Sequence, residues 1–425
     1  MRPLVIMAGL FFIIGFVTWL NGPLITFVQV AFGLGPVGAF LVPMCFYLSY
    51  LFCAAPAMGL ARRTGLRNGI AVALGAMAAG TLVFGECVGR RWYPGALGGL
   101  SILGAGLTLL QVTVNPYVAL LGTAGQAARR IAIMGVANKV SGIIAPVLFS
   151  ILVMHDIGGV AGRLHDAGSA QAREVVLAAF AHAVVVPYRC MAVMLLVVAF
   201  ALRHVGLPDI RLRDAAVVSL SRREGPAPRM GALARAGIGV VFVYVGVEVL
   251  AGDGVGLYGI HVGLSLAQTR FLTSVTLGAM LCGYLLGTVL VPAMCSQLAY
   301  LALSAMLGMA LCLGVAFLHG VWSVACVTLL GLANAMMMPI LFPLVLNLAG
   351  HRQSQATMLL VMAFCGGGVM PQVFAFLIGL VGLKPAFAGL VISSYGVVLL
   401  YALLLWRHVR RGGKDAAGPD LGALS

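Results

Sequence analysis

The chain has 425 residues, of which 62% are hydrophobic and 9% are charged, and its mean hydropathy is +1.08. This composition excludes a soluble globular protein and predicts a polytopic membrane protein. The formal net charge of +15 would suggest nucleic acid binding in a soluble chain, but the arginines gather in alternate loops between apolar segments. We therefore expect the lipid bilayer as a partner and no nucleic acid.

Hydropathy and polar breaks divide the chain into twelve apolar segments, each long enough to cross a bilayer as a helix. The expected spans are 4–28, 38–60, 68–88, 94–122, 131–154, 184–203, 236–252, 268–291, 297–318, 321–349, 355–380 and 384–406. They lack the period-two alternation of barrel strands, so the fold is predicted to be all-α. We expect one bundle of six helices in residues 1–203, a linker in 204–235, a second bundle in 236–406 and a tail in 407–425.

The basic residues predict the orientation of the chain. Three loops on one side hold Arg62, Arg63 and Arg67, then Arg129 and Arg130, then seven arginines from Arg203 to Arg235. The positive-inside rule places these loops and both termini in the cytoplasm of a cell whose inner membrane holds the protein. Arg90 and Arg91 on the outer side, and the uncharged inner loop 292–297, run against this assignment.

The first expected span contains Trp19-Leu-Asn-Gly-Pro-Leu24, a polar interruption in an apolar run. Asn-Gly-Pro is typical of an unwound turn, and freed backbone carbonyls of this kind often line a binding site inside a membrane protein. The alternative is a helix that simply ends here in an interfacial turn. Trp19 and Asn21 are therefore candidate ligand-binding residues.

The fourth expected span puts Gln111 and Asn115 on one helical face and follows them with Pro116, where we expect the backbone hydrogen-bond ladder to break. An amide that faces hydrocarbon costs several kcal/mol. This face is therefore predicted to look toward other helices or toward something that they enclose.

The fifth expected span carries Asn138 and Lys139 beside a stripe of small residues, Gly135 and Gly142. The stripe favours close packing of a neighbouring helix. A lysine within a span must reach water, a partner or the interface, so Lys139 either faces a polar interior or snorkels to the membrane surface.

Two acidic residues lie in or near the seventh expected span. Glu248 is the one carboxylate of the sequence that falls well inside an expected span, and a carboxyl group in a cavity that changes hydration can bind and release a proton. The alternative is a structural glutamate paired to a cation. Asp253 is expected nearer the rim, as a loop or cap residue. Residues 155–183 carry mixed charges and are expected to form an external loop.

The last spans repeat features of the first half. Span ten has Asn334 before a proline, and span eleven has Gly366-Gly-Gly-Val-Met-Pro-Gln372. A shift of 225 residues lays Gly142 on Gly367 and Pro146 on Pro371. Two similar six-helix halves are therefore expected to enclose a cavity near the midplane.

Five motifs carry a resemblance to a known family. They are residues 16–24, 110–118, 133–139, 244–253 and 331–336. In this order they resemble the fucose-proton symporter family of the major facilitator superfamily, and within it the glucose/galactose transporter branch. The resemblance implies two six-helix bundles related by a pseudo-twofold axis that move by alternating access around a sugar. Members of the fucose branch carry carboxylates where this chain has Gly22 and Gln111, so proton coupling through those two positions is not expected.

A hexose needs side chains that both donate and accept hydrogen bonds, together with an aromatic or apolar surface. The candidate substrate-binding residues are Asn21, Gln111, Asn115, Asn138, Asn334 and Gln372, with Trp19, Tyr47 or Tyr117 to stack on a sugar face. For each amide alone, a hydrogen bond between helices is the competing interpretation. Glu248, with Lys139 nearby, is the candidate ion-coupling group.

The sequence therefore predicts a secondary active transporter that takes up a hexose together with a proton or a sodium ion. An uncoupled sugar facilitator and a membrane sugar sensor that does not transport are the alternatives. We expect a monomer without cofactor or metal, and we do not expect an enzyme, because the spans show no nucleophile, metal pair or paired carboxylates.

Overall fold

The computed structural model describes residues 2–120, 127–204 and 230–412, and these residues form helices and turns without a strand. Twelve of the helical segments are long and apolar enough to cross a membrane. Each overlaps one of the spans expected from hydropathy, although the sixth begins at Ala170 instead of residue 184, so the all-α fold with twelve spans is confirmed.

The helices follow one another in two groups. The first holds α1 (Arg2–Trp19), α2 (Asn21–Phe32), α3 (Pro36–Ala39), α4 (Leu41–Gly89), α5 (Tyr93–Leu120), α6 (Ala127–Leu152), α7 (Ile157–Asp166), α8 (Ala170–His182) and α9 (Val185–His204). The second holds α11 (Ala232–Gly252), α12 (Val255–His261), α13 (Leu266–Thr269), α14 (Leu272–Ala293), α15 (Gln297–Phe317), α16 (Gly320–Asn334), α17 (Met337–Ala349), η2 (Gly350–Arg352), α18 (Gln353–Ala363), α19 (Gly366–Val381) and α20 (Leu383–Gly412).

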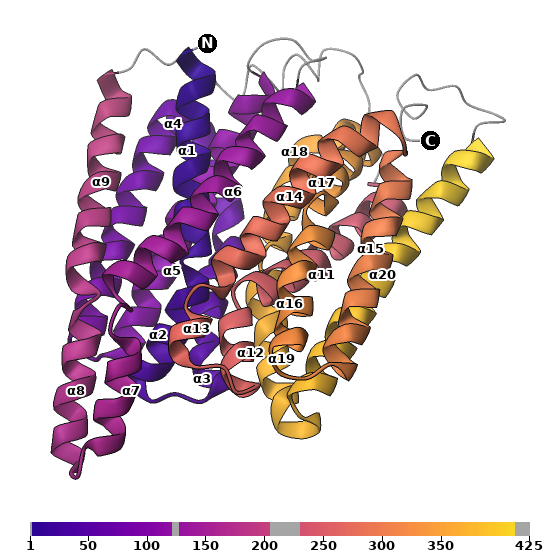
Figure 1. Ribbon diagram of the computed structural model, residues 1–425. Coiled ribbons are helices and arrows are strands. Elements are labelled where there is room, and N and C mark those ends of the chain that lie inside the picture. Colours follow the sequence, from indigo (N-terminus) through magenta and orange to yellow (C-terminus); the bar gives the residue numbers. More distant parts are fainter. Residues whose placement is uncertain (1, 121–126, 205–229, 413–425) are drawn as a thin grey trace.

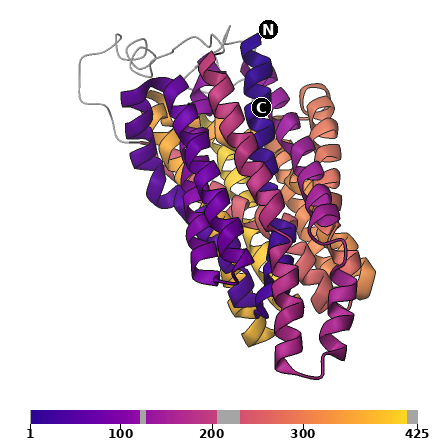
Figure 2. The same cartoon turned by 90° about the vertical axis from the view of Figure 1, so that its left-hand side faces the viewer.

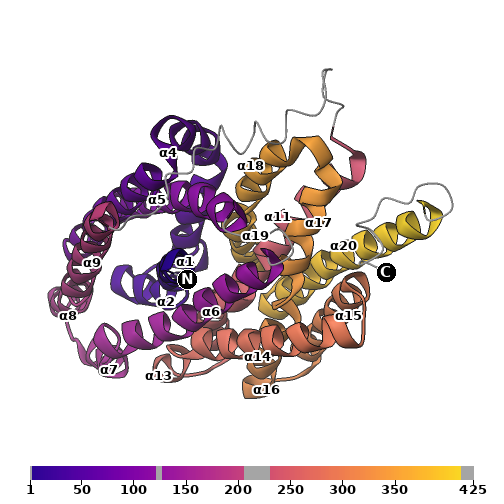
Figure 3. The ribbon, with the colours of Figure 1, turned by 90° about the horizontal axis from the view of Figure 1, so that it is seen from above.

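The same packing scheme is used in both halves. In the first half α1 packs on α6, and α4 packs on α5 and α9. In the second half α11 packs on α18 and α19, α14 on α16, and α15 on α20. These are equivalent spans six positions apart in the order, so the two halves are matched six-helix bundles that lie beside each other (Figure 3). The start of α1 and the end of α20 lie at the same end of the molecule (Figure 1).

Helix α4 contains two spans that run in opposite directions. The chain reverses at Gly65, whose φ of 80° lies in the region that residues with a side chain rarely adopt. This turn lies in the basic segment that contains Arg62, Arg63 and Arg67.

Several spans of the described chain consist of two helices joined at a break. The first breaks at Leu20 between α1 and α2, the tenth at Ala335 and Met336, and the eleventh at Phe364 and Cys365, each at a polar or glycine-rich motif that the sequence singled out. The seventh span, Ala232–Gly252, is the helix α11, and α12 continues it after a break at Asp253 and Gly254; the two helices together are called the broken seventh span below. In α2, Pro23 lies within the first turn, where a helix leaves its N–H groups unpaired and tolerates a proline.

At Pro116 the helix α5 continues to Leu120, so the proline interrupts the hydrogen-bond ladder through its missing N–H but does not end the helix. A proline removes a single N–H donor from the ladder, and in a span packed against neighbouring helices the rest of the ladder can continue past it.

The expected external loop 155–183 is a helical hairpin instead. Helices α7 and α8 extend beyond the bundle at the end opposite the start of α1 (Figures 1 and 2). Ser169 caps α8 by accepting a hydrogen bond from the backbone N–H of Ala172, which explains how a polar segment starts this helix.

The described ends of the second bundle differ from the expected ones. Helix α11 begins at Ala232 and α20 continues to Gly412, so both extend past the boundaries 236 and 406. Most of the expected linker 204–235 and of the tail 407–425 lies outside the described residues.

Candidate functional site

A buried ion pair joins the two halves. The ammonium Nζ of Lys139 on α6 lies 2.9 Å from the carboxylate Oε1 of Glu248 on α11. Their side chains are 7% and 12% exposed, which excludes the interpretation of Lys139 as a snorkelling residue. Removing one partner of such a pair leaves a buried charge unpaired and costs about 3–5 kcal/mol. Each charge therefore depends on the other for its burial, and the pair links the two halves while both groups are charged.

Two aromatic rings complete the surroundings of the ammonium group. Nζ of Lys139 lies 4.4 Å from the ring centroid of Trp19 on α1 and 5.9 Å from that of Tyr284 on α14. Both distances are within the range of a cation–π attraction, which is strongest for desolvated groups. The lysine of the first half is therefore held by both halves.

Trp19 lies where the broken first and seventh spans meet. A methyl group added at Gly142 of α6 or at Gly252 of α11 would collide with the indole ring, so these glycines permit the two helices to approach it. The indole Nε1–H donates to Oδ1 of Asn138 at 3.4 Å, and Nδ2 of Asn138 donates to the carbonyl oxygen of Phe11 at 3.4 Å. Asn138 thus orients the indole from within the first half.

Polar atoms without a partner flank Trp19 in the chain. Nδ2 of Asn21 and Oγ1 of Thr18 are buried and have no hydrogen-bond partner within the described residues. A buried polar group left unpaired costs about 1–3 kcal/mol. Such groups are uncommon in native structures and are candidates for contact with a ligand.

Gln111 belongs to a group of side chains from the first half that faces the second. Its Nε2 donates to the hydroxyl of Tyr50 at 2.8 Å. Tyr50 stacks on Tyr47 with ring centroids 5.9 Å apart, and it meets Phe46 and also Phe364, at the break of the eleventh span, edge-on. Tyr47 lies against Gly367 of α19. This aromatic pair therefore covers the break between α18 and α19.

Asn334 lies inside the second bundle. Its Oδ1 accepts a hydrogen bond from the hydroxyl of Tyr395 at 2.9 Å, and its backbone oxygen accepts one from the hydroxyl of Tyr244 at 3.0 Å. Its Nδ2 is buried without a partner in the described part of the chain. The oxygen of this amide is therefore used to join α16 to α20, while the nitrogen stays available.

Gln372 is not brought to the ion pair. Gln372 on α19 donates from Nε2 to the carbonyl oxygen of Val37 at 3.3 Å, near the short helix α3 that follows the first span. The side chain of Asn115, like that of Tyr117, lies outside the described residues.

Further hydrogen bonds join the two halves at the end of the molecule opposite the start of α1 and the end of α20. Nη1 of Arg270, between α13 and α14, donates to the carbonyl oxygens of Met154 at 2.9 Å and His155 at 3.1 Å. The hydroxyl of Ser150 donates back to the carbonyl oxygen of Arg270 at 2.8 Å. These bonds attach the end of α6 to the start of α14.

Asp253 corrects an expectation from the sequence. It follows α11 as its cap residue, but it is 1% exposed instead of lying at the rim. Neither of its carboxyl oxygens forms a hydrogen bond of good geometry with a described residue, and the backbone of Gly22 on α2 lies beside the carboxyl group. The signal in the sequence was an acidic residue between Gly252 and Gly254 directly after an apolar span. The sequence could not show that the first span would bury it.

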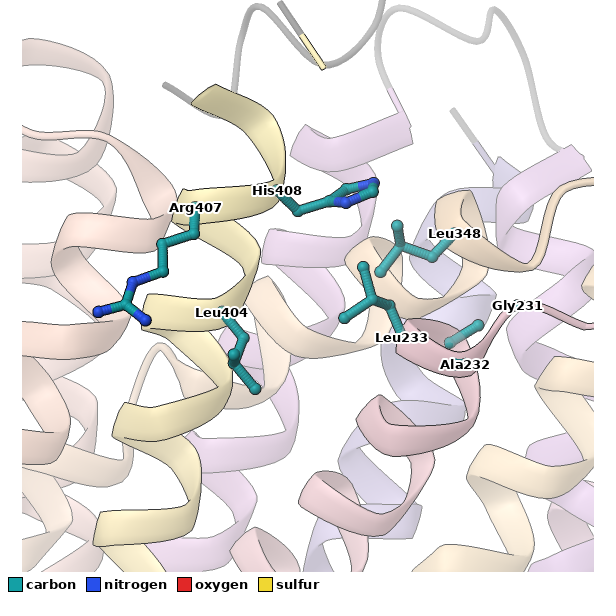
Figure 4. A pocket seen from close by; sticks show the side chains of 8 residues that line it. Gly231, Ala232, Leu233, Leu348, Leu404, Arg407 and His408 are labelled. Carbon is teal, nitrogen blue, oxygen red and sulfur yellow. The ribbon is translucent and has the colours of Figure 1, made fainter. Parts of the chain in front are cut away.

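A pocket of about 610 Å³ lies elsewhere, between the start of α11 and the ends of α17 and α20 (Figure 4). Leucines 233, 348 and 404 contribute much of its lining, and the side chains of Arg407 and His408 point in opposite directions. It belongs to the second half alone, so it is separate from the residues around the ion pair. Within the described ranges no group of three or more His, Cys, Asp and Glu side chains is arranged to hold a metal ion.

Comparisons with known proteins cover nearly the whole chain. No family model matches the sequence. The glucose/galactose transporter of Brucella abortus is 29% identical over 400 residues, which cover 93% of this chain and 92% of that protein. The L-fucose-proton symporter of Haemophilus influenzae is 25% identical over 429 residues, covering 96% and 97%. Among solved structures, a major facilitator superfamily transporter, FucP, in the outward conformation has a TM-score of 0.72 at 25% identity, covering 95% and 98%.

Proposed function

Since the chain belongs to the fucose-proton symporter and glucose/galactose transporter family of the major facilitator superfamily, we propose that it is a secondary active transporter that takes up a hexose by alternating access. Glucose and galactose are the proposed sugars, and a proton or a sodium ion is the proposed coupling ion. The observation that carries the proposal is the meeting of two broken spans around Trp19, with unpaired polar atoms and an ion pair between the halves.

The chemistry of a hexose fits the residues around Trp19. The unpaired Nδ2 of Asn21 is a donor for a sugar hydroxyl, and Asn138 on α6 and Gln111 on α5 hold amides beside Trp19 and Tyr50. Indole and phenol rings supply the apolar surface for the C–H face of a sugar. We propose Trp19, Asn21, Gln111 and Asn138 as the inner part of the substrate site.

We propose that the remaining amides contact the sugar at other points of its path through the protein. Gln372 lies toward the end of the molecule away from Arg2, where the sugar would arrive first. Asn334 contributes its unpaired Nδ2 from the second bundle. Asn115 stays a predicted site residue on the span that carries Gln111.

The coupling proposal rests on Glu248 and Lys139. A conformational cycle is driven by an ion only if the ion binds one state more tightly than the other. An ion pair that spans the two halves is sensitive to their separation, so a change of its charge changes the relative free energies of the states.

We also propose the orientation of the molecule. The arginines near Gly65, on the side of Arg2 and Gly412, support a cytoplasmic position for this end in a cell inner membrane. The hydrogen bonds of Arg270 then lie on the outer side, and they describe a state closed to the outside. We expect the transporter to act as a monomer.

Uptake of radiolabelled hexoses by proteoliposomes tests the function. We expect glucose or galactose to accumulate above the external concentration when an inward proton or sodium gradient is imposed. Fucose and mannose serve as competitors that define the specificity. Equal concentrations on both sides under either gradient would indicate facilitation, and the absence of uptake of all four sugars would contradict the proposal.

A further inference from the structure

Asp253 carries a carboxyl group that the described chain buries without a partner. The residue is 1% exposed, and neither Oδ1 nor Oδ2 forms a hydrogen bond of good geometry with a described residue, although the backbone of Gly22 on α2 lies close enough to interact with the carboxyl group. It lies between Gly252 and Gly254, where the seventh span passes from α11 to α12. A charged carboxylate in such a place costs several kcal/mol or more. It is therefore stable only with a ligand that removes or balances its charge.

The charges around Asp253 do not balance. The titratable groups that face it are Glu248 on its own helix, Lys139 on α6 and Tyr47 on α4. From α2 it is faced by the backbone of Gly22, over which Thr273 of α14 packs, and neither contributes a charge. Two carboxylates against one ammonium group leave this described cluster with one negative charge in excess.

We propose that Asp253 binds the coupling proton of the transporter, and that its protonation keeps Lys139 paired with Glu248. This inference rests on the proposed transport function and goes beyond it, because it assigns the titrating group to Asp253 instead of to the ion pair. In this assignment Glu248 and Lys139 are positioning residues that respond to the state of Asp253.

A proton fits the site better than a metal ion. A proton removes the charge of the carboxylate by forming an O–H bond, whereas a sodium ion would remain charged close to the ammonium group of Lys139. The described residues also provide no group of three or more acidic, histidine or cysteine side chains that could surround a metal ion.

The geometry connects proton binding to movement of the halves. Lys139 belongs to the first half, and both carboxylates belong to the second, at positions five residues apart on the same span. When Asp253 releases its proton, a second carboxylate competes for the one ammonium group of the cluster. This competition shifts the contact of Lys139 with the seventh span from Glu248 toward Asp253, and the two halves move relative to each other. The proton enters from the water on one side of the membrane and leaves to the water on the other side. The O–H bond of Asp253 is the one covalent bond that forms and breaks.

Infrared difference spectroscopy of the purified protein tests proton binding without any sugar. We expect the C=O stretch of a protonated buried carboxyl group to appear in the wild type on going from alkaline to acidic pH, to persist in Glu248→Gln and to disappear in Asp253→Asn. Asp166→Asn on α7 is the matched control, because it makes the same change at an exposed aspartate. A band unaffected by Asp253→Asn, or one that responds to sodium and not to pH, would overturn the proposal.

Uptake by proteoliposomes tests the coupling. We expect Asp253→Asn to equilibrate hexose across the membrane but not to accumulate it under a proton gradient, and Asp253→Glu to restore part of the accumulation. Undiminished accumulation by Asp253→Asn would overturn the proposal. If the wild type transports no hexose while its carboxyl band depends on Asp253, the proposed function fails and the proton site is supported.

Discussion

Lys139 on α6 and Glu248 on α11 form an ion pair, 2.9 Å long, that runs from one half of the molecule to the other. Because both side chains are buried, their attraction is screened little by water, and each depends on the other for its charge to be tolerated. The relative position of the halves is therefore linked to the ionisation of the groups around this pair.

The first prediction concerns the stability of the ion pair. At a pH where Asp253 is protonated, Glu248→Gln leaves Lys139 buried without its counter-charge, and we expect a loss of about 3–5 kcal/mol of stability. Thermal unfolding in detergent should show a lower midpoint for this variant. The double variant with Lys139→Met and Glu248→Leu should recover much of the loss, because it removes both charges.

Glu86→Gln is the control for this measurement. Glu86 pairs with Arg189 at 2.6 Å, but both side chains are more than a third exposed, and surface pairs contribute little. Equal unfolding temperatures of Glu248→Gln and Glu86→Gln would show that Lys139 does not depend on Glu248 for its burial.

The second prediction concerns closure at the end opposite Arg2. Arg270→Ala removes the hydrogen bonds to the carbonyl oxygens of Met154 and His155. We expect the distance between spin labels at Gly162 on α7 and Ala267 on α13 to shift toward longer values. Arg163→Ala is the control, because Arg163 pairs with Asp156 within the same half. An unchanged distance distribution in Arg270→Ala would show that these bonds do not hold the halves together.

The third prediction separates a binding amide from a structural one. Nδ2 of Asn21 has no partner in the described residues, so Asn21→Ala should change the unfolding midpoint little. It should raise the hexose concentration for half-maximal uptake about tenfold, as expected for the loss of about 1.4 kcal/mol of binding. Asn334→Ala should instead lower the midpoint, because it leaves the buried hydroxyl of Tyr395 without its acceptor. The reverse pattern would place the substrate contact at Asn334.

Much of the fold could be predicted from the sequence, because spanning helices are determined by local properties. Twenty or so apolar residues in a row need no partner to indicate a span, and all twelve spans were identified in this way. The breaks at Leu20, Ala335 and Phe364 could also be predicted, since each lies at a motif of asparagine, glycine or proline. Pro116 shows the limit of this reasoning, because the helix continues past it.

The candidate site could be predicted only in part. Lys139 and Glu248 were recognised as costly charges in spans, and their proximity is found in the structure, while their role in coupling stays a prediction. The burial of Asp253 depends on the first span, more than 200 residues away in the chain. The hydrogen bonds of Arg270 depend on the packing of α6 against α14. Such relationships arise from the docking of the two halves and leave no periodic signal in the sequence.

The fluorescence of Trp19 tests the location of the hexose site most directly. Trp19 is buried between the halves, whereas Trp92, Trp322 and Trp406 are exposed and can be replaced by phenylalanine. In the resulting single-tryptophan protein we predict a saturable change of fluorescence on addition of the transported hexose, with a midpoint that moves to higher concentration in Asn21→Ala. A protein that accumulates hexose in vesicles without any change of Trp19 fluorescence would contradict a sugar site at the meeting of the broken first and seventh spans.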